Sequence, residues 1–161
     1  MPAPASVSIA VSSTSSSGTA SVADNVVSWQ TGYPFGVSLG RGYPRFNPGE
    51  FTTSDTLARG EADAALIIAS DPMGNFSQPA REHLARIPYV ALDPKESPTV
   101  RAATVAFTTA TYGINTAGTV YRMDDVPIPL RPAFESPYPS DEVVLKAIEK
   151  RVRQLQGVPV D

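Results

Sequence analysis

The pattern of apolar positions predicts strands alternating with helices in the middle of the chain. The continuous apolar run Ala64–Ala69 fits a strand buried on both faces. The segment ending at Asp93 and the segment Thr104–Phe107 predict two further strands. Between them, Pro79 is placed to start a helix with apolar residues at i, i+4 and i+7, and Ser97–Ala102 predicts a turn or short helix. This order requires crossover connections, so we expect a parallel sheet in a small α/β domain.

Further elements flank this region. Thr53 or Ser54 can cap a short helix that ends before Gly60. Asn25–Trp29 predicts a short strand, and Ser140–Gln156 predicts an amphipathic helix that stops at a glycine. Two charged pairs at i, i+4 favour this last helix: Glu142 with Lys146 and Glu149 with Arg153.

Two long segments are rich in proline and glycine. Thr31–Phe51 holds five glycines and three prolines, so we expect no regular element there. Tyr112–Pro139 predicts a hairpin around Gly118 and then an extended arm. A loop this long in a compact domain is usually functional or faces a partner, so we expect one of these roles for Thr31–Phe51.

The composition narrows the possible functions. The chain has 161 residues, 42% of them hydrophobic, and a net charge of -3, which argues against nucleic acid as the main partner. Its longest apolar run is far shorter than the ~20 residues needed to cross a bilayer. With no cysteine and one histidine, His83, the chain can supply no thiolate and no His-rich metal site.

The first 23 residues carry no charged side chain, and Ser, Ala and Thr dominate them. We expect this segment to be disordered or to form an edge strand, because Val7, Ile9 and Val11 alternate. The predicted organisation is this segment, one domain over residues 24–157, and a tail over 158–161. A secretory signal needs a basic region and a longer apolar run, so we expect a cytoplasmic protein.

Two predicted strands end in the same way, with an aspartate before a proline. Asp71 follows Ser70, and Asp93 ends the next strand. Ligands often meet the carboxyl ends of parallel strands, where a carboxylate could bind a ribose hydroxyl or a base edge. The alternative is that each aspartate caps the following helix, which is the more common situation.

Other catalytic patterns are weaker. The segment Gly36–Gly40 matches a nucleophile elbow with Ser38, and His83 follows in the order of an α/β-hydrolase. The surrounding glycines and prolines leave no room for the helix that an elbow requires, so we predict no catalytic residue. No phosphate-binding loop is present. Asp124 and Asp125 are adjacent and point to opposite faces of an extended chain, so they predict no metal site.

Several distinctive segments together resemble the C-terminal part of the B subunit of formylmethanofuran dehydrogenase, over about residues 25–155. They are "SWQTGYPFGVSLGRGYPRFNPGEF" (Ser28–Phe51), "LARGEADAALIIASDPMGNF" (Leu57–Phe76), "IPYVALDP" (Ile87–Pro94) and "GINTAGTVYRMDDVPIPLRP" (Gly113–Pro132).

The resemblance implies a Rossmann-like domain similar to a nucleotide-binding domain of molybdopterin oxidoreductases. In the family, a tungsten or molybdenum pterin and an iron–sulfur cluster are held by the N-terminal half, which this chain lacks. By resemblance, the segments near the pterin nucleotide would give a vestigial pocket here, with five candidate residues: Ser70, Asp71, Asp93, Gly118 and Thr119.

The lack of cysteine makes the chain look like the truncated B subunit of the bacterial formyltransferase/hydrolase complex. That resemblance implies a non-catalytic structural subunit in formaldehyde oxidation to formate, with amidohydrolase-like, C-subunit-like and formyltransferase partners. It also implies a methanofuran-type carrier and a metal held by another subunit, with no cofactor or metal on this chain. For such a subunit, the Thr31–Phe51 loop and the Pro127–Pro139 arm are the expected partner contacts. Candidate carrier or partner contacts are Arg41, Arg45, Arg122, Tyr33, Tyr43 and Phe46. The alternative is a split subunit of a genuine dehydrogenase that still contributes to a pterin site.

Overall fold

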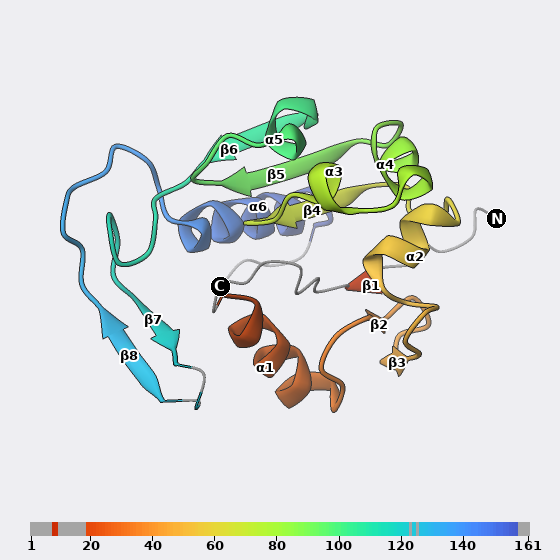
Figure 1. The fold of residues 1–161 in the computed structure, drawn as a ribbon, viewed down its shortest axis with the longest axis horizontal. Coiled ribbons are helices and arrows are strands. Elements are labelled where there is room, and N and C mark those ends of the chain that lie inside the picture. Colours follow the sequence, from red (N-terminus) through yellow and green to blue (C-terminus); the bar gives the residue numbers. More distant parts are fainter. Residues whose placement is uncertain (1–7, 10–18, 123, 125, 158–161) are drawn as a thin grey trace.

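The computed structural model describes residues 8–9, 19–122, 124 and 126–157 (Figure 1). At its centre is a parallel sheet of β4 (Ala65–Ile68), β5 (Tyr89–Asp93) and β6 (Val105–Thr108), in that order. Leu66 lies opposite Val90 in the register. The predicted parallel α/β sheet is therefore confirmed.

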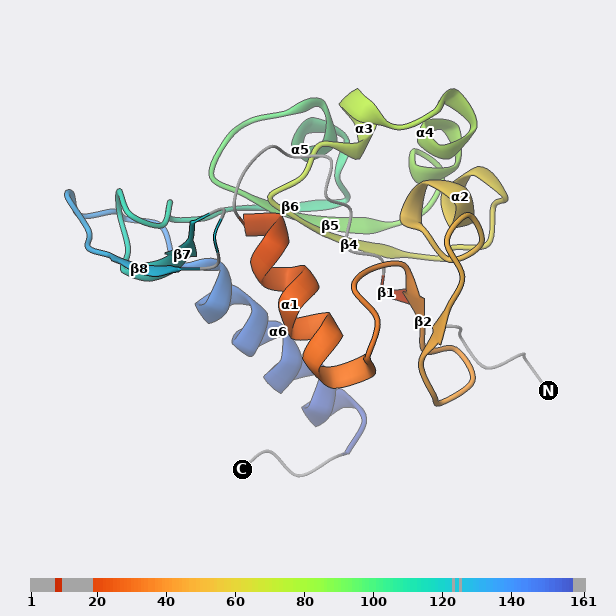
Figure 2. The same cartoon turned by 60° about the horizontal axis from the view of Figure 1, so that its bottom comes forward.

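Short helices cover one face of this sheet. They are α2 (Thr53–Ala58), α3 (Pro72–Asn75), α4 (Gln78–Leu84) and α5 (Pro98–Ala102). All but α3 were predicted, and Figure 2 shows α3, α4 and α5 above the sheet. The core joins Leu57, Ala80, Leu84, Tyr89 and Ala91. Burying one side chain such as Leu84 contributes roughly 1.5–3 kcal/mol, so this cluster anchors the domain.

The opposite face of the sheet is only partly covered. It faces α6 (Asp141–Leu155), which lies beneath the sheet in Figure 2. Leu66 and Ile68 of β4 remain 51% and 40% exposed. The prediction that this strand is buried on both faces is therefore wrong, because β4 is an edge strand with helices packed closely against one side only.

The long loop after residue 31 contains two short strands. β1 (Ser8–Ile9), β2 (Val37–Ser38) and β3 (Arg45–Phe46) form an antiparallel sheet. The expectation of no regular element over Thr31–Phe51 is therefore wrong, because glycine turns allow the chain to fold back on itself.

The N-terminal region departs from the prediction in one further respect. Asn25–Trp29 is not a strand but part of helix α1 (Thr19–Thr31). The hydroxyls of Ser28 and Thr31 donate to the carbonyls four residues earlier, at 2.8 and 2.7 Å, which satisfies the polar groups within the helix. Ile9 pairs with Val37 in an edge strand, whereas Val7 and Val11 lie outside the described residues. The division at residues 23 and 157 stays a prediction.

A β-hairpin extends from the body of the molecule (Figure 1). β7 (Gly118–Tyr121) pairs with β8 (Pro127–Leu130), and α1 lies beside β7. The predicted hairpin is confirmed, although Gly118 begins its first strand instead of forming its turn. The arm that follows β8 is held where the N–H groups of Ala133 and Phe134 both donate to the Ile114 carbonyl at 2.9 Å.

The predicted C-terminal helix is present with its caps. The Ser140 hydroxyl accepts from the Val143 N–H at 3.4 Å, and Gly157 ends the helix with a positive φ of 70°. Both predicted i, i+4 ion pairs form on its exposed side. Within the described ranges, no helix is both long and apolar enough to cross a membrane.

Candidate functional site

The first strand-end aspartate, Asp71, is bound to a neighbouring helix. Its Oδ1 accepts from the N–H of Thr99 at 3.1 Å and from the Thr99 hydroxyl at 2.5 Å. The Met73 N–H in turn donates to that hydroxyl at 3.0 Å. Asp71 therefore fixes the first turn of α5 to the loop after β4, and its side chain does not cap α3, the helix that follows it.

The backbone before Asp71 is unusual. Ala69 has a φ of 49°, a left-handed conformation that costs free energy in a non-glycine residue. Its N–H donates to the Leu92 carbonyl at 2.9 Å, which prolongs the sheet by one bond beyond β4. The turn then brings the half-buried Ser70 and Asp71 to the carboxyl edge of the sheet, where sequence reasoning expected them.

The second strand-end aspartate, Asp93, is half-buried at the same edge. Its Oδ1 accepts from the Lys95 N–H at 2.8 Å, which is a local turn and not a helix cap. Burial raises the pKa of the Asp93 carboxyl, and the negative charges of Asp141 and Asp71 raise it further, against the Lys95 hydrogen bond. The structure thus brings a third carboxylate, Asp141, to the two that the sequence indicated.

Two buried polar atoms near this edge lack partners. They are Asp141 Oδ1 and the hydroxyl of Thr109, which follows β6 and is 2% exposed. Burial raises the pKa of the Tyr112 phenol, and the charge of Asp141 adds to the shift. Asp71, Asp93, Thr109, Tyr112 and Asp141 therefore form what we call the edge cluster. Its carboxylates can accept hydrogen bonds from hydroxyl, amide or amino groups.

Sequence reasoning missed three members of this cluster. Asp141 carried only the signal of a residue in the first turn of a helix. Thr109 and Tyr112 stand in loops with no local pattern. Thr109 and Tyr112 follow β6, whose last residue pairs with Asp93 in the register. Only the fold, which returns the chain from the hairpin to the sheet where the Ala110 N–H donates to the Pro139 carbonyl at 2.8 Å, brings Asp141 to this edge.

The other two pocket candidates lie on the hairpin. A Cβ at Gly118 would lie 2.7 Å from Cδ1 of Tyr112, so glycine is needed there for close packing. Thr119 is exposed on β7. In the part of the chain that the structure describes, no recorded interaction joins Gly118 or Thr119 to Asp71 or Asp93. Tyr112 connects the hairpin with the edge cluster, because its ring packs on Gly118 and the charge of Asp141 raises the pKa of its phenol.

The candidate contact residues of the long loop form an aromatic group. The rings of Tyr33 and Phe46 stack with centroids 5.2 Å apart, and Phe35 meets Phe46 edge-on at 5.6 Å. The Arg45 guanidinium lies 4.7 Å from the ring centroid of Phe51, while its Nε is buried without a hydrogen-bond partner.

The remaining candidate contact residues differ in their exposure and in whether their charge is already paired. Arg41 and Tyr43 are exposed at the tip of the loop. The Arg122 guanidinium donates to both carboxylate oxygens of Asp124, and this ion pair lowers the pKa of the Asp124 carboxyl. Asp125 lies outside the described residues.

The nucleophile elbow is not formed. Ser38 is buried at 3% exposure in β2, and the chain continues through a turn into β3 instead of a helix. His83 lies in α4, where its Nε2 is 2.7 Å from the Ala62 carbonyl. Among the described residues, no group of three His, Asp or Glu side chains is placed to hold a metal ion.

Comparison with curated proteins decides the family. Over 134 residues, 82% of its length, the chain is 48% identical to the B subunit of the tungsten-containing formylmethanofuran dehydrogenase 2 of Methanocaldococcus jannaschii. It is a homologue of the formylmethanofuran dehydrogenase B subunit. The same subunit from Methanococcus maripaludis is 42% identical over 135 residues. This B-subunit homologue spans 31% of the length of each of these relatives, and no family model matches it.

A solved structure extends the relationship. The B-subunit homologue superimposes with a TM-score of 0.66 and 25% identity on a chain of the formyltransferase/hydrolase complex (FhcABCD) from Methylorubrum extorquens, solved in complex with methylofuran. The match covers 84% of this chain and 37% of that chain. The expected relationship to both assemblies is therefore confirmed.

Proposed function

We propose that the chain is a structural, non-catalytic part of the B subunit in a formyltransferase/hydrolase complex of one-carbon metabolism. In this proposal, other subunits transfer the formyl group and release formate. The fold match to a chain of such a complex, over 84% of the residues, carries the proposal. Cytoplasmic location belongs to the same proposal.

The described surface supports a packing role. Large apolar side chains are exposed on several elements, among them Trp29 of α1 at 75%, Phe134 of the arm at 71% and Leu155 of α6 at 71%. Subunits of stable complexes expose such apolar surface until they assemble. The proposed partners are amidohydrolase-like, C-subunit-like and formyltransferase subunits.

The carrier in this proposal is of the methanofuran type, as in the methylofuran complex of the structural relative. Arg41 and Tyr43, exposed at the loop tip, are the proposed contacts to the carrier or a partner, with the exposed Tyr33 and the half-buried Arg45 and Phe46 as further candidates. Arg122 is the weaker candidate because Asp124 already engages its guanidinium. A metal, where the reaction needs one, would belong to another subunit.

A second candidate is a dehydrogenase in which this Rossmann-like segment forms one wall of a pterin site. The 48% identity to a tungsten-containing enzyme favours it. The donor set does not fit the redox centre, because the 161 residues include no cysteine to ligate tungsten or an iron–sulfur cluster. The edge cluster offers hydrogen-bond acceptors for a nucleotide, with Asp93 freer than Asp71, which is already bound to Thr99.

The proposal is tested by formate release from a formylated methanofuran-type carrier, assayed with complex purified through this chain. We expect Asp93→Asn and Asp71→Asn to leave the rate per assembled complex unchanged. A tenfold or greater fall in that rate would assign these side chains a direct role in the reaction. Stoichiometric tungsten or molybdenum with a bound pterin would favour the dehydrogenase instead.

A further inference from the structure

The face of the sheet opposite the core is apolar and incompletely covered. In the register, Ile68, Leu92 and Phe107 lie side by side across the three strands. Leu92 of the central strand is 1% exposed, whereas Phe107 of the edge strand β6 is 37% exposed. Both edge strands are open on this face, since Ile68 of β4 is also 40% exposed, and on the β6 side Phe107 faces α6.

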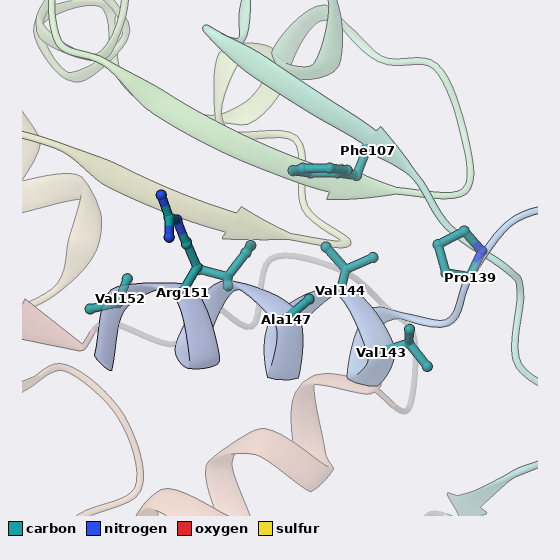
Figure 3. Close-up of a pocket in the computed structure, with 8 residues that line it drawn as sticks. Phe107, Pro139, Val143, Val144, Ala147, Arg151 and Val152 are labelled. Carbon is teal, nitrogen blue, oxygen red and sulfur yellow. The ribbon is translucent and has the colours of Figure 1, made fainter. Parts of the chain in front are cut away.

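An open groove runs along α6 at this side (Figure 3). We call it the α6 groove, and it is lined chiefly by Phe107, Val143, Val144, Ala147, Ile148 and Arg151. Phe107 lies above the helix in Figure 3, and Val144 of α6 points up toward it. Val144 is buried, but Val143, one residue away, is 58% exposed. The groove is therefore an apolar surface that the described residues leave uncovered.

Arg151 is the cationic residue among those that line the α6 groove. Lys146 and Arg153 pair with Glu142 and Glu149. Arg151 lines the groove, and its Nη1 reaches only the amide oxygen of Gln154, at 3.4 Å. Among the described residues, no carboxylate pairs with it. A cation beside apolar surface favours an occupant that brings its own carboxylate.

The spacing of the lining residues defines the shape of the occupant. Val144, Ala147 or Ile148, and Arg151 follow each other at three- and four-residue intervals, so they form a ridge that the grooves of a facing helix match. From Val143 to Arg151 the ridge is about 12 Å long, at 1.5 Å per residue, which is two turns of a partner helix.

We propose that the α6 groove binds an amphipathic helix of another polypeptide, whose aliphatic stripe packs against Val144, Ala147 and Phe107 and whose Asp or Glu pairs with Arg151. This is the helix-in-groove mode of recognition. The inference rests on the proposed membership of a complex and adds a site and a chemistry for one partner.

Site-specific photo-cross-linking in the host cell tests the proposal. Ala147 is replaced by p-benzoylphenylalanine, and Glu149, on the opposite side of α6, is replaced in a control. We expect the first variant to cross-link to a helical segment that carries an Asp or Glu within one turn of the linked residue. The control should not reach that segment. Cross-links to a second copy of this chain, to an extended segment, or to nothing would overturn the proposal.

A charge exchange separates recognition from folding. Arg151→Glu should raise the dissociation constant for the cross-linked partner about tenfold. Replacing the partner's carboxylate by Lys should restore most of the lost affinity. Arg153→Glu makes the same substitution two residues away, at a residue that pairs with Glu149 and does not line the groove. It should change the dissociation constant less than threefold. Equal effects of the two substitutions, or no rescue, would contradict the inference.

The outcomes also separate this inference from the proposed function. If formyltransferase and hydrolase subunits co-purify but Ala147 forms no adduct, the groove proposal fails and the function stands. If the adduct and the charge rescue are found with an unrelated polypeptide, the groove proposal stands and the function fails.

Discussion

Asp71 and Thr99 are joined by two hydrogen bonds across 28 residues of sequence, from the Thr99 N–H at 3.1 Å and from its hydroxyl at 2.5 Å. Thr99 is fully buried at the start of α5, and its hydroxyl also accepts from the Met73 N–H. This pair therefore joins the connection between β4 and β5 to the connection between β5 and β6.

Replacing Thr99 by Val should destabilise the protein. The change keeps the shape but leaves the Met73 N–H without its acceptor and removes one bond to Asp71, which costs about 1–3 kcal/mol. Urea denaturation of the purified protein measures this. Thr119→Val, the same substitution at an exposed strand position, should change stability by less than about 0.5 kcal/mol. Equal midpoints for the two variants would refute a structural role for the pair.

The Leu84 side chain tests the location of the core. Leu84 is fully buried between α4 and the sheet, so Leu84→Ala should cost about 2–5 kcal/mol. Leu155→Ala removes the same atoms from an exposed position on α6 and should cost far less. Thermal denaturation of both variants compares them, and a larger loss for Leu155 would place the core elsewhere.

Gly118 and Tyr112 should show strong coupling. A methyl group at Gly118 would meet the Tyr112 ring at 2.7 Å, so Gly118→Ala should destabilise the hairpin by about 1–3 kcal/mol. In the Tyr112→Ala background the same change should cost much less, because the ring is gone. A double-mutant cycle by denaturation measures the coupling, and simple additivity would rule out the contact.

Asp93 should make stability depend on pH. Its pKa is raised in the folded state, so the folded protein holds this proton more tightly than the unfolded chain does. Stability should fall as pH rises from the unfolded value of about 3.8 through the higher folded pKa, and then level off. Asp93→Asn should therefore be more stable than wild type at pH 7, with a smaller difference near pH 4.

Asp124 supplies the contrast for that experiment. Arg122 lowers the pKa of its carboxyl, so Asp124→Asn should lose stability at neutral pH instead of gaining it. Denaturation at a series of pH values follows both variants. The account would be contradicted if both substitutions shifted stability in the same direction at pH 7.

The sequence predicted elements whose patterns are local. The strand–helix–strand order from Ala65 to Thr108 and the Ser140-capped helix follow from periodicity and capping residues close together in the chain. It failed at α1, where strand propensity is a weak guide. The β-branched residues before Trp29 favour a strand, yet α1 forms there.

The candidate site was predictable only in part. Asp71 and Asp93 share a visible motif at strand ends, and the structure places both at one edge of the sheet. Their actual partners, Thr99 and Asp141, come from distant segments and carry no sequence signal, because tertiary contacts alone bring them together. The exposure of Leu66 was equally hidden, since the sequence does not reveal that β4 is an edge strand.

Native mass spectrometry of the complex isolated from its host through a tag on this protein tests the central claim most directly. We predict a hetero-oligomer from which this subunit dissociates at the mass of its polypeptide alone, alongside formyltransferase and hydrolase subunits. A protein that stays monomeric, or one that leaves the complex carrying the additional mass of a pterin and tungsten, would contradict the account.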